Sequence, residues 1–238
     1  MNKWLDEDPV QIEYYVSSKD VILIERKKQL QLMLDIFNFY FSTKKDLKFL
    51  DIGCGDGVLT KLMYEKYPDN TFHLLDGSKS MMEKARESIK TEKASFFNDT
   101  IENFFATNSN ECYYDFIFSS MAIHHIEHHK KFELFSRIYT LLKQKGLFIN
   151  IDVVLSASEI TEKIQFKLWV DYINEYLKNS NRDAEIGKHN DLPATYKGKS
   201  ENKPSSLESQ LNMLKDTGFK DVECYYKYGI FVLYAGIK

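Results

Sequence analysis

The chain has 238 residues, a formal net charge of −3 at pH 7 and a sequence pI near 6.1. With 43% hydrophobic and 28% charged residues, its composition is typical of a soluble globular protein with a substantial core. These values exclude a generally basic phosphate-binding surface, and no apolar run approaches the roughly 18 residues of a membrane span.

Cysteine usage and the N-terminal composition indicate the cellular compartment. Cys54, Cys112 and Cys224 form neither a CxxC pair nor an even framework, which favours a reducing environment. The first nine residues lack a basic region followed by an apolar run, so they do not predict a secretion leader. We therefore expect a cytoplasmic protein without membrane contact.

The N-terminal third of the chain predicts a helix followed by a buried strand. Residues 10–20 are aromatic and polar and lead into a segment, 21–41, whose apolar residues recur every three or four positions. We predict one long amphipathic helix there. The apolar run at 47–52 predicts a buried parallel strand.

A glycine cluster directly follows this strand. Gly53, Gly55 and Gly57 fall within five positions, and residues 57–67 show helical spacing. Glycines between a strand and a helix let the backbone approach a ligand closely, and the helix N-terminus offers free N–H groups. The pattern predicts a turn that binds a nucleotide cofactor.

The remaining predicted strands and helices alternate along the chain. Strands are expected at 71–76, 94–97, 114–118 and 147–152, with an antiparallel closing pair at 219–226 and 229–237. Helices are expected at 78–90, 101–105 (one turn), 129–143, 158–178 and 206–217, with Gly218 as a C-cap and polar loops at 106–112 and 179–205. This alternation predicts βαβ units and a parallel sheet covered on both faces.

Carboxylates end three successive predicted strands, at the edge where open α/β sheets bind ligands. Asp51 is placed to hold a cationic, amino-acid-bearing group, Asp76 to accept hydrogen bonds from a ribose diol, and Asp99 to receive an adenine amino group. A dinucleotide fingerprint requires Gly or Ala where this chain has Val58, which opposes a nicotinamide cofactor.

The motifs resemble those of the class I S-adenosylmethionine-dependent methyltransferases, particularly the small-molecule branch with an N-terminal helical cap. The blocks that carry the resemblance span about residues 50–237 and are Phe49–Gly57, Leu74–Ser78, Phe97–Thr100, Asp115–His125, Leu141–Ile149 and Leu214–Phe219. The chain departs from the family pattern at Lys143–Gly146, where Lys-Pro-Gly-Gly is usual, and at Gly77, where an apolar residue is common.

The resemblance implies an α/β fold with a seven-stranded, mostly parallel sheet, helices on both faces and an antiparallel last strand. We expect a single domain, made of a helical cap (1–44), a cofactor-binding core (45–155), a substrate-side insertion (156–205) and a closing helix and strand pair (206–238). The implied cofactor is S-adenosyl-L-methionine. Its expected contacts are Asp51, Gly53, Cys54, Gly55, Asp76, Gly77, Ser78, Asp99, Thr100 and Ser119, with Tyr15 and Arg26 from the cap.

Catalysis of methyl transfer needs mainly a positioned nucleophile in a dry pocket, and a base only when the acceptor is protonated. The candidate bases are His124, His125 and Asp152, although the histidine pair could equally serve as structural support. The histidines at 124, 125, 128 and 129 would offer i,i+4 pairs on a helix, but no complete ligand set is visible, so no metal is predicted.

The sequence therefore predicts an S-adenosylmethionine-dependent methyltransferase that acts on a small-molecule acceptor by in-line displacement. The alternatives are a non-catalytic S-adenosylmethionine-binding or regulatory protein, and a methyltransferase acting on RNA or protein. We expect no nucleic-acid or membrane partner and a monomer or homodimer. The sequence leaves open the acceptor and its accepting atom.

Overall fold

A single mixed sheet organises the structure. The computed structural model describes residues 9–108 and 111–238, and in these ranges seven strands pair in the order β3-β2-β1-β4-β5-β7-β6. The strands are β1 (Lys48–Ile52), β2 (Thr71–Asp76), β3 (Ala94–Asn98), β4 (Tyr114–Ser120), β5 (Leu142–Val153), β6 (Lys220–Tyr228) and β7 (Phe231–Ile237). The first five run parallel, and β7 pairs antiparallel with both β5 and β6. The predicted fold class and the antiparallel closing strand are confirmed.

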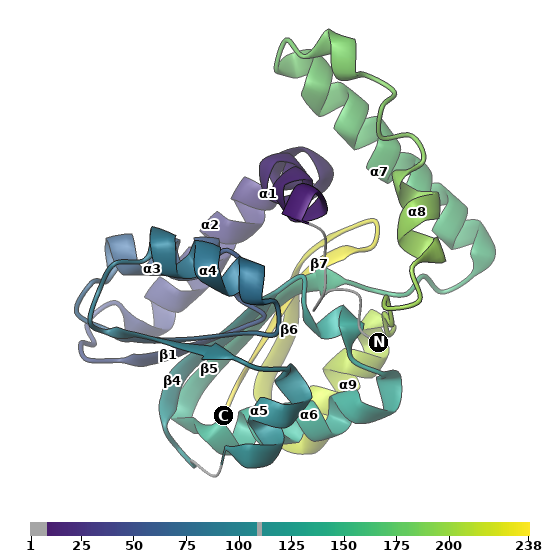
Figure 1. Ribbon diagram of the computed structural model, residues 1–238. Coiled ribbons are helices and arrows are strands. Elements are labelled where there is room, and N and C mark those ends of the chain that lie inside the picture. The colour runs from purple at the N-terminus through teal and green to yellow at the C-terminus, as the bar shows by residue number, and fades with distance from the viewer. Residues whose placement is uncertain (1–8, 109–110) are drawn as a thin grey trace.

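Helices cover both faces of this sheet (Figure 1). They are α1 (Pro9–Ile22), α2 (Arg26–Phe41), α3 (Val58–Lys66), α4 (Lys79–Ser88), α5 (Ile101–Thr107), η2 (Ile123–His125), α6 (His128–Leu141), α7 (Glu159–Asn179), η3 (Asp183–Glu185), α8 (Leu192–Gly198) and α9 (Leu207–Thr217). On one face Phe37 of α2 packs on Phe49 and Phe116, with ring centres 5.3 and 5.1 Å apart. On the other face Leu50 and Ile117 join the core with α6. The period-two alternation of the strands thus builds two cores.

The N-terminal cap consists of two helices where one was expected. Residues 10–20 are helical, α1 ends at Ile22, and α2 begins at Arg26. Between them Glu25 adopts a left-handed conformation (φ 46°), which breaks the helix and lets α1 turn across the sheet edge. Residues 1–8, where the expected cap begins, lie outside the described residues.

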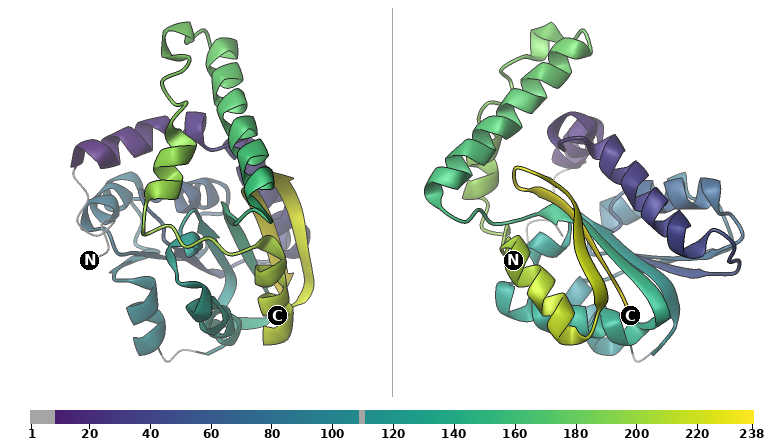
Figure 2. Two further views of the ribbon diagram at one scale, coloured as in Figure 1. Left: turned by 90° about the vertical axis from the view of Figure 1, so that its right-hand side faces the viewer. Right: turned by 180° about the vertical axis from the view of Figure 1, so that it is seen from behind.

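The insertion after β5 contains more helix than expected. The predicted helix is α7, but the predicted loop 179–205 also contains η3 and α8. We name residues 159–198 the arm, because they stand away from the sheet (Figures 1 and 2). Pro193, taken as a loop signal, lies in the first turn of α8, where proline is compatible with a helix.

Two smaller boundaries also differ from expectation. The turn expected at Lys145-Gly146 is an irregularity inside β5, with Lys145 at φ 64° and a register shift against β4. The helical turn expected at 101–105 extends to Thr107, and residues 109–110 of the expected loop lie outside the described residues. In the described part of the chain, no helix is both long and apolar enough to cross a membrane.

Candidate functional site

A cavity lies at the carboxyl ends of β1, β2 and β4, the edge at which parallel sheets bind ligands. The cap closes one side of it, and the segment after β4 closes another. The residues that line it are Tyr15, Lys19, Leu23, Arg26, Asp51, Gly53, Cys54, Gly55, Asp56, Val58, Leu59, Asp76, Gly77, Ser78, Met81, Thr100, Ile101, Glu102, Ser120, Met121, Ala122, His125 and Ile126.

The glycine turn is fixed by hydrogen bonds to the end of β2. The N–H groups of Gly53 and Cys54 both donate to the Leu75 carbonyl, at 2.8 and 2.9 Å. Gly53 (φ +68°) lies so close to Ala122 that a Cβ would come within 2.2 Å of its methyl group. Gly55 (φ +54°) instead faces open space, with nothing within 4 Å of an added Cβ. The turn therefore presents bare backbone to the cavity.

Two carboxylates form the polar floor beside this turn. Asp51 is 2% exposed and accepts a 2.7 Å hydrogen bond from the Thr60 hydroxyl, and its burial raises the pKa of the carboxyl to about 7. Asp76 accepts 2.8 Å hydrogen bonds from the N–H groups of Gly55 and Ser78, and burial raises the pKa of this carboxyl too. Both groups can accept further hydrogen bonds or a positive charge from a ligand.

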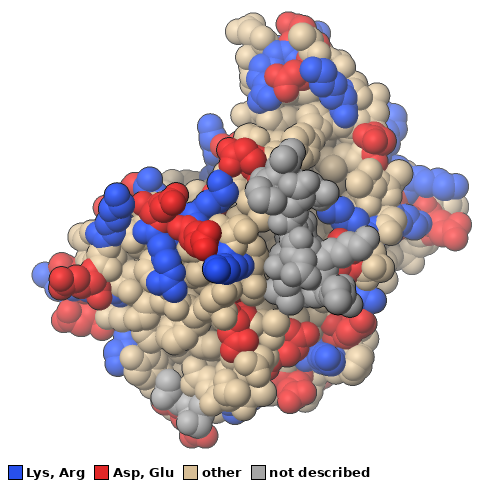
Figure 3. Space-filling view, in the orientation of Figure 1, with Lys and Arg blue, Asp and Glu red and all other residues tan. Residues whose placement is uncertain are grey.

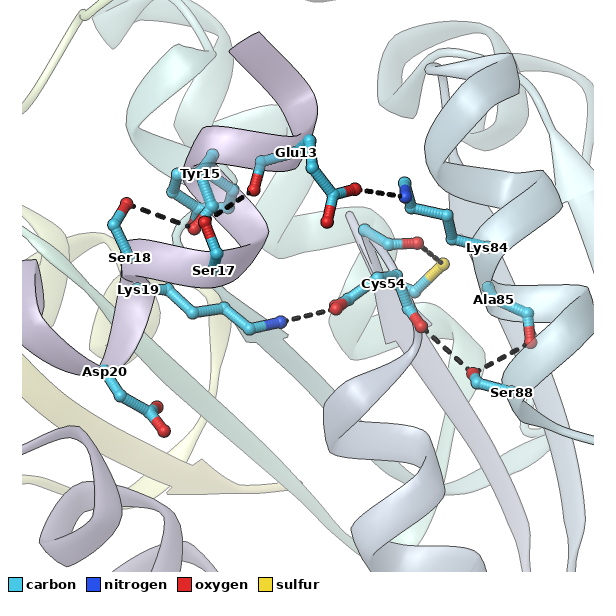
Figure 4. Close-up of polar contacts among 12 residues, drawn as sticks. Glu13, Tyr15, Ser17, Ser18, Lys19, Asp20, Cys54, Lys84, Ala85 and Ser88 are labelled. Atoms are coloured by element: carbon cyan, nitrogen blue, oxygen red, sulfur yellow. Dashed lines mark hydrogen bonds and ion pairs between the residues drawn. The ribbon is translucent and has the colours of Figure 1, made fainter. Parts of the chain in front are cut away.

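Helix α1 lies directly over the glycine turn. The Lys19 ammonium forms a 2.5 Å ion pair with Asp56 inside the turn, and the two side chains are 12% and 20% exposed. Glu13 forms an ion pair with Lys84 of α4 at 2.8 Å, so α1 contacts both the glycine turn and the helix that follows β2 (Figure 4). The far end of the helix is held by Trp169, whose indole N–H donates to the Ile22 carbonyl at 2.7 Å.

Arg26 brings a guanidinium to the cavity wall with most of its donors unused. Its side chain is 11% exposed, and Nη1 donates to the Asp20 carboxylate at 2.5 Å. Among the described residues its other N–H groups have no hydrogen-bond partner. Nearby Tyr15 has its phenol pKa raised to about 12 by burial, although Arg26 opposes that shift. A buried guanidinium in this state fits a ligand carboxylate.

The two candidate histidines differ sharply in environment. His124 is 5% exposed, its Nδ1 is 2.6 Å from one oxygen of Asp152, and its backbone N–H donates to the other oxygen at 2.9 Å. Burial alone would raise the pKa of Asp152, but His124 and this hydrogen bond hold it below its ordinary value. His125 lines the cavity, and burial followed by the adjacent His124 lowers its pKa to about 3.

The loop after the arm is fastened to this histidine segment. The Lys203 N–H donates to the His124 carbonyl at 2.7 Å, and His125 Nδ1 is 3.1 Å from the Glu201 carbonyl. Fully buried Lys131 donates to the Lys203 carbonyl at 2.7 Å and to the Ser205 hydroxyl at 3.0 Å. Burial lowers the Lys131 pKa to about 8. The arm is thereby anchored at its C-terminal end over β4 and β5.

The structure brings most of the predicted site residues to this cavity. The predicted residues that line it are Tyr15, Arg26, Asp51, Gly53, Cys54, Gly55, Asp76, Gly77, Ser78, Thr100 and His125. Among the cavity-lining residues that sequence reasoning missed, Asp56 belongs to the glycine motif and could have been found there. Lys19 gave no signal, because a single lysine on a helix is normally solvated.

Four predicted residues do not line the cavity. Ser119 is fully buried and its hydroxyl donates to the Ile52 carbonyl at 2.8 Å, so the next residue, Ser120, takes its place in the wall. The Asp99 carboxylate accepts from the Thr100 N–H (2.8 Å) and Asn103 (2.6 Å), which makes it a support for the start of α5. His124 and Asp152 form the buried pair described above, and the His124 ring centre is 4.0 Å from that of His125, which lines the cavity.

The histidines of this region do not share one helix. The first two lie in η2, whereas His128 and His129 begin α6, so the i,i+4 geometry required for a metal pair is missing. Among the described residues, no group of three or more His, Cys, Asp or Glu side chains is arranged to hold a metal ion. The visible surface mixes basic and acidic side chains without a continuous basic face among the described residues of that view (Figure 3).

Comparisons with known proteins identify residues 49–146 as a match to a family described as a methyltransferase domain. Malonyl-[acyl-carrier protein] O-methyltransferase 1 of Ilyobacter polytropus is 30% identical over 109 residues, 45% of this chain and 38% of that protein. Carboxy-S-adenosyl-L-methionine synthase of Nautilia profundicola is 22% identical over 89% of this chain and 85% of that protein. The chain thus spans well under half of the first relative but most of the second.

A solved structure shares the fold over the whole chain. Phosphoethanolamine N-methyltransferase 2 of Haemonchus contortus, in complex with S-adenosyl-L-methionine, matches with a TM-score of 0.65 and 18% identity. The match covers 100% of this chain and 59% of that one. At this level of identity the likeness concerns the fold alone.

Proposed function

We propose that the chain, whose residues 49–146 match a methyltransferase domain, is a class I S-adenosylmethionine-dependent methyltransferase that transfers the methyl group to a small-molecule acceptor. One observation carries the proposal about the acceptor: Tyr15, Lys19, Leu23 and Arg26 of the cap line the same cavity as the glycine turn. A site covered by its own chain has room for a compact acceptor and little access for a folded macromolecule.

The residues present fit the cofactor. S-adenosyl-L-methionine supplies an electrophilic methyl group on a sulfonium, flanked by an amino acid and an adenosine. In our proposal Asp51 holds the ammonium group, Arg26 pairs with the carboxylate, and Asp76 accepts hydrogen bonds from the ribose hydroxyls. Gly55 lets the backbone approach, and Thr100 and Ile101 contact the adenine.

His124 is the proposed general base. Its Nδ1 lies 2.6 Å from Asp152, so in this role Nδ1–H donates to the carboxylate and Nε2 is the atom that accepts the proton of the acceptor. A buried carboxylate that fixes a histidine tautomer in this way prepares the other nitrogen to accept a proton. His125, with a pKa near 3, is neutral at physiological pH but too weakly basic for this task, so we assign it to the cavity wall.

Calorimetric titration and a labelled-methyl assay test the proposal together. We expect S-adenosylhomocysteine to bind with micromolar or tighter affinity and NAD not to bind. Wild-type protein with methyl-labelled S-adenosylmethionine should label the small-molecule fraction of a cell extract, while purified RNA and protein stay unlabelled. Label found only in RNA or protein would contradict the small-molecule acceptor. The assignment of S-adenosylmethionine as the cofactor would still hold.

A second candidate reaction is the formation of a carboxylated derivative of the same sulfonium from a carboxyl-bearing donor. It is favoured by the spare donors of Arg26 and by relatives named carboxy-S-adenosyl-L-methionine synthase, of which the chain covers 75–85%. Mass spectrometry of the nucleoside fraction separates the two reactions. Methyl transfer yields S-adenosylhomocysteine, whereas carboxylation yields a sulfonium that is heavier than the starting compound.

A further inference from the structure

We propose that Thr60 of α3 is a positioning residue for the cofactor, because its hydroxyl keeps the Asp51 carboxylate ionised and oriented for the ligand's ammonium group. The inference rests on the proposed binding of S-adenosylmethionine and concerns the same cavity. It arises from two observations: Asp51 is buried beside other acidic groups, and a single residue donates hydrogen bonds to it.

Asp51 is a buried carboxylate between two apolar neighbours. It lines the cavity and is 2% exposed. In the sheet it pairs with Leu74 of β2 on one side and with Phe118 of β4 on the other, and neither side chain can bond to it. A carboxylate in this position loses most of the water that would stabilise its charge, so its ionisation depends on donors supplied by the protein.

Thr60 supplies these donors from the first turn of α3. Its side chain is fully buried, and its hydroxyl donates to Oδ2 of Asp51 at 2.7 Å. A threonine within a helix often directs its hydroxyl to a carbonyl of the preceding turn, whereas this hydroxyl reaches a side chain nine positions earlier in the chain. No other residue in the described part of the chain donates to this carboxylate, so its remaining acceptor positions are available to a ligand.

The charges nearest to Asp51 oppose its ionisation. Burial is the main cause that raises its pKa to about 7, and the negative charges of Asp76 and Asp56 act in the same direction. The main influences that lower this pKa both come from Thr60, first from its hydroxyl and then from its backbone N–H. Thr60 is therefore the group that favours the charged form of Asp51.

The other titratable groups of the cavity do not replace Thr60. Besides Asp56 and Asp76 they are Tyr15, Lys19, Arg26, Cys54, Glu102 and His125. Shifts in pKa caused by burial keep Tyr15, Cys54 and His125 neutral at pH 7. The two cations are paired with the aspartates at 56 and 20, and Glu102 is exposed and negative. Among the described residues, no cation forms an ion pair with Asp51.

Thr60 thereby controls how readily the site accepts an ammonium group. Only the ionised form of Asp51 pairs with that group, and a hydrogen bond to the ionised form stabilises it. Without the Thr60 hydroxyl, the carboxyl should keep its proton to a higher pH. Binding near neutral pH would then have to release that proton to solvent, and the affinity would fall.

Calorimetric titration with S-adenosylhomocysteine at several pH values tests the inference. Thr60→Val keeps the shape of the side chain and removes the hydroxyl, whereas Thr60→Ser keeps the hydroxyl. We expect Thr60→Val to lower the affinity about fivefold or more at pH 7, and this factor should shrink at least about threefold by pH 8.5. Thr60→Ser should follow the wild-type pH dependence. Ionisation of the ligand cancels, because the proteins are compared at the same pH.

A control variant and a control ligand exclude general effects. The Thr140 hydroxyl donates to the Ser136 carbonyl within α6 at 3.0 Å and does not line the cavity, so Thr140→Val should bind like wild type at every pH. Methylthioadenosine lacks the ammonium group, and it should bind equally well to wild type and Thr60→Val.

The titration of Asp51 in the ligand-free protein gives a second readout. Carbon-13 NMR of its carboxyl should show a midpoint near pH 7 in wild type and a midpoint about one unit or more higher in Thr60→Val. Thr60→Ala removes the hydroxyl without adding a methyl group, and it provides the same comparison if Thr60→Val folds poorly.

The outcomes separate the inference from the proposed function. An unchanged affinity in Thr60→Val, an equal loss at pH 7 and pH 8.5, or a loss shared with methylthioadenosine would overturn the role of Thr60. In those cases the threonine would support only the shape of the turn, and the cofactor assignment would stand. Wild-type protein that binds neither ligand would overturn the proposed function itself.

Discussion

Lys19 of α1 and Asp56 of the glycine turn form an ion pair of 2.5 Å that joins the cap to the cofactor-binding core. Both side chains are largely buried. The negative charges of Asp76 and Asp56 both act on the nearby carboxyl of Asp51. Lys19 thus offsets negative charge at the place where the cap touches the turn.

The first prediction concerns this pair. Removing Lys19 leaves Asp56 beside other carboxylates, so Lys19→Ala should destabilise the protein by about 1–3 kcal/mol. Hydrogen exchange of residues 9–22 should accelerate in the same variant. Lys28→Ala is the control, because its ion pair with Glu25 is exposed at the lysine and should contribute little. Equal exchange in α1 of both variants would contradict a role for Lys19 in holding the cap.

The second prediction pairs a change in Arg26 with a change in the ligand. Arg26→Ala should weaken S-adenosylhomocysteine binding about 10- to 100-fold, because a charge-assisted bidentate contact with the carboxylate is lost. Methylthioadenosine lacks that carboxylate, and its affinity should be the same for wild type and variant in calorimetry. If both ligands lose affinity equally, Arg26 supports the shape of the site and does not contact the carboxylate.

The third prediction is a pH dependence set by Asp51. Its pKa of about 7 means that near neutral pH the carboxyl must lose a proton to pair with the ligand's ammonium group. The affinity for S-adenosylhomocysteine should rise about fivefold from pH 6 to pH 7 and about twofold more above pH 7, and it should level off near pH 8. Titrations in buffers of different ionisation enthalpy should show proton release, and Asp51→Asn should abolish both effects.

The same carboxyl affects the stability of the ligand-free protein in the opposite sense. Its folded pKa lies above the ordinary 3.8, so folding favours the protonated form. That contribution is complete below pH 3.8 and is lost as the pH rises through 7. The ligand-free free energy of unfolding should therefore fall less over this range in Asp51→Asn than in wild type.

The fourth prediction separates the two histidines. The pKa of His125, lowered to about 3, favours its neutral form in the folded state, whereas in the unfolded chain it takes up a proton near 6.5. Its contribution to the free energy of unfolding is present above pH 6.5 and is lost as the pH falls toward 3. In His125→Gln the free energy of unfolding should therefore fall less steeply between pH 6.5 and pH 3 than in wild type. Turnover should fall less than tenfold in His125→Gln, well short of the loss expected for His124→Asn. Equal losses in kcat would contradict the assignment of the base.

The fifth prediction contrasts two glycines of one turn. Gly53→Ala places a methyl group 2.2 Å from that of Ala122, so the variant should unfold readily or express poorly. Gly55→Ala has open space around its new methyl and should remain folded, with about 1 kcal/mol of strain from its positive φ. Because we place the ligand against Gly55, this folded variant should still lose affinity for S-adenosylhomocysteine. Unchanged affinity would show that the ligand does not lie against Gly55.

The sheet and the donor side were predictable because their signals are local. The glycines directly follow β1, Asp76 ends the next strand, and a buried parallel strand reads as a continuous apolar run. Helix α1 was missed for the opposite reason. Its Tyr15 faces the cavity while Tyr14 contacts His189 of the arm at 3.2 Å, so its burial follows no single stripe. A helix buried on two sides lacks the apolar residues at every third or fourth position by which an amphipathic helix is recognised in a sequence.

The acceptor side could be predicted only as a set of candidates. His124 and His125 are adjacent and chemically identical in the sequence, and only the fold shows which of them reaches Asp152, 28 positions away. The arm includes a segment whose Pro193 and Gly198 resemble loop punctuation, which concealed α8. Contacts that arise only from tertiary packing between distant segments produce no recognisable sequence motif.

The hydrogen bond from Trp169 to the Ile22 carbonyl joins segments 147 positions apart, and Tyr14 meets His189 across 175 positions. Together with the 2.9 Å hydrogen bond from the Glu25 N–H to the Tyr172 hydroxyl, these contacts join the cap to the arm beside the cofactor-binding core. Exchanging one of them for the corresponding segment of another enzyme would leave an indole or a phenol facing the wrong surface. A change of substrate preference in this lineage should thus involve paired substitutions in both segments, and chimeras should tolerate the joint swap better than either single one.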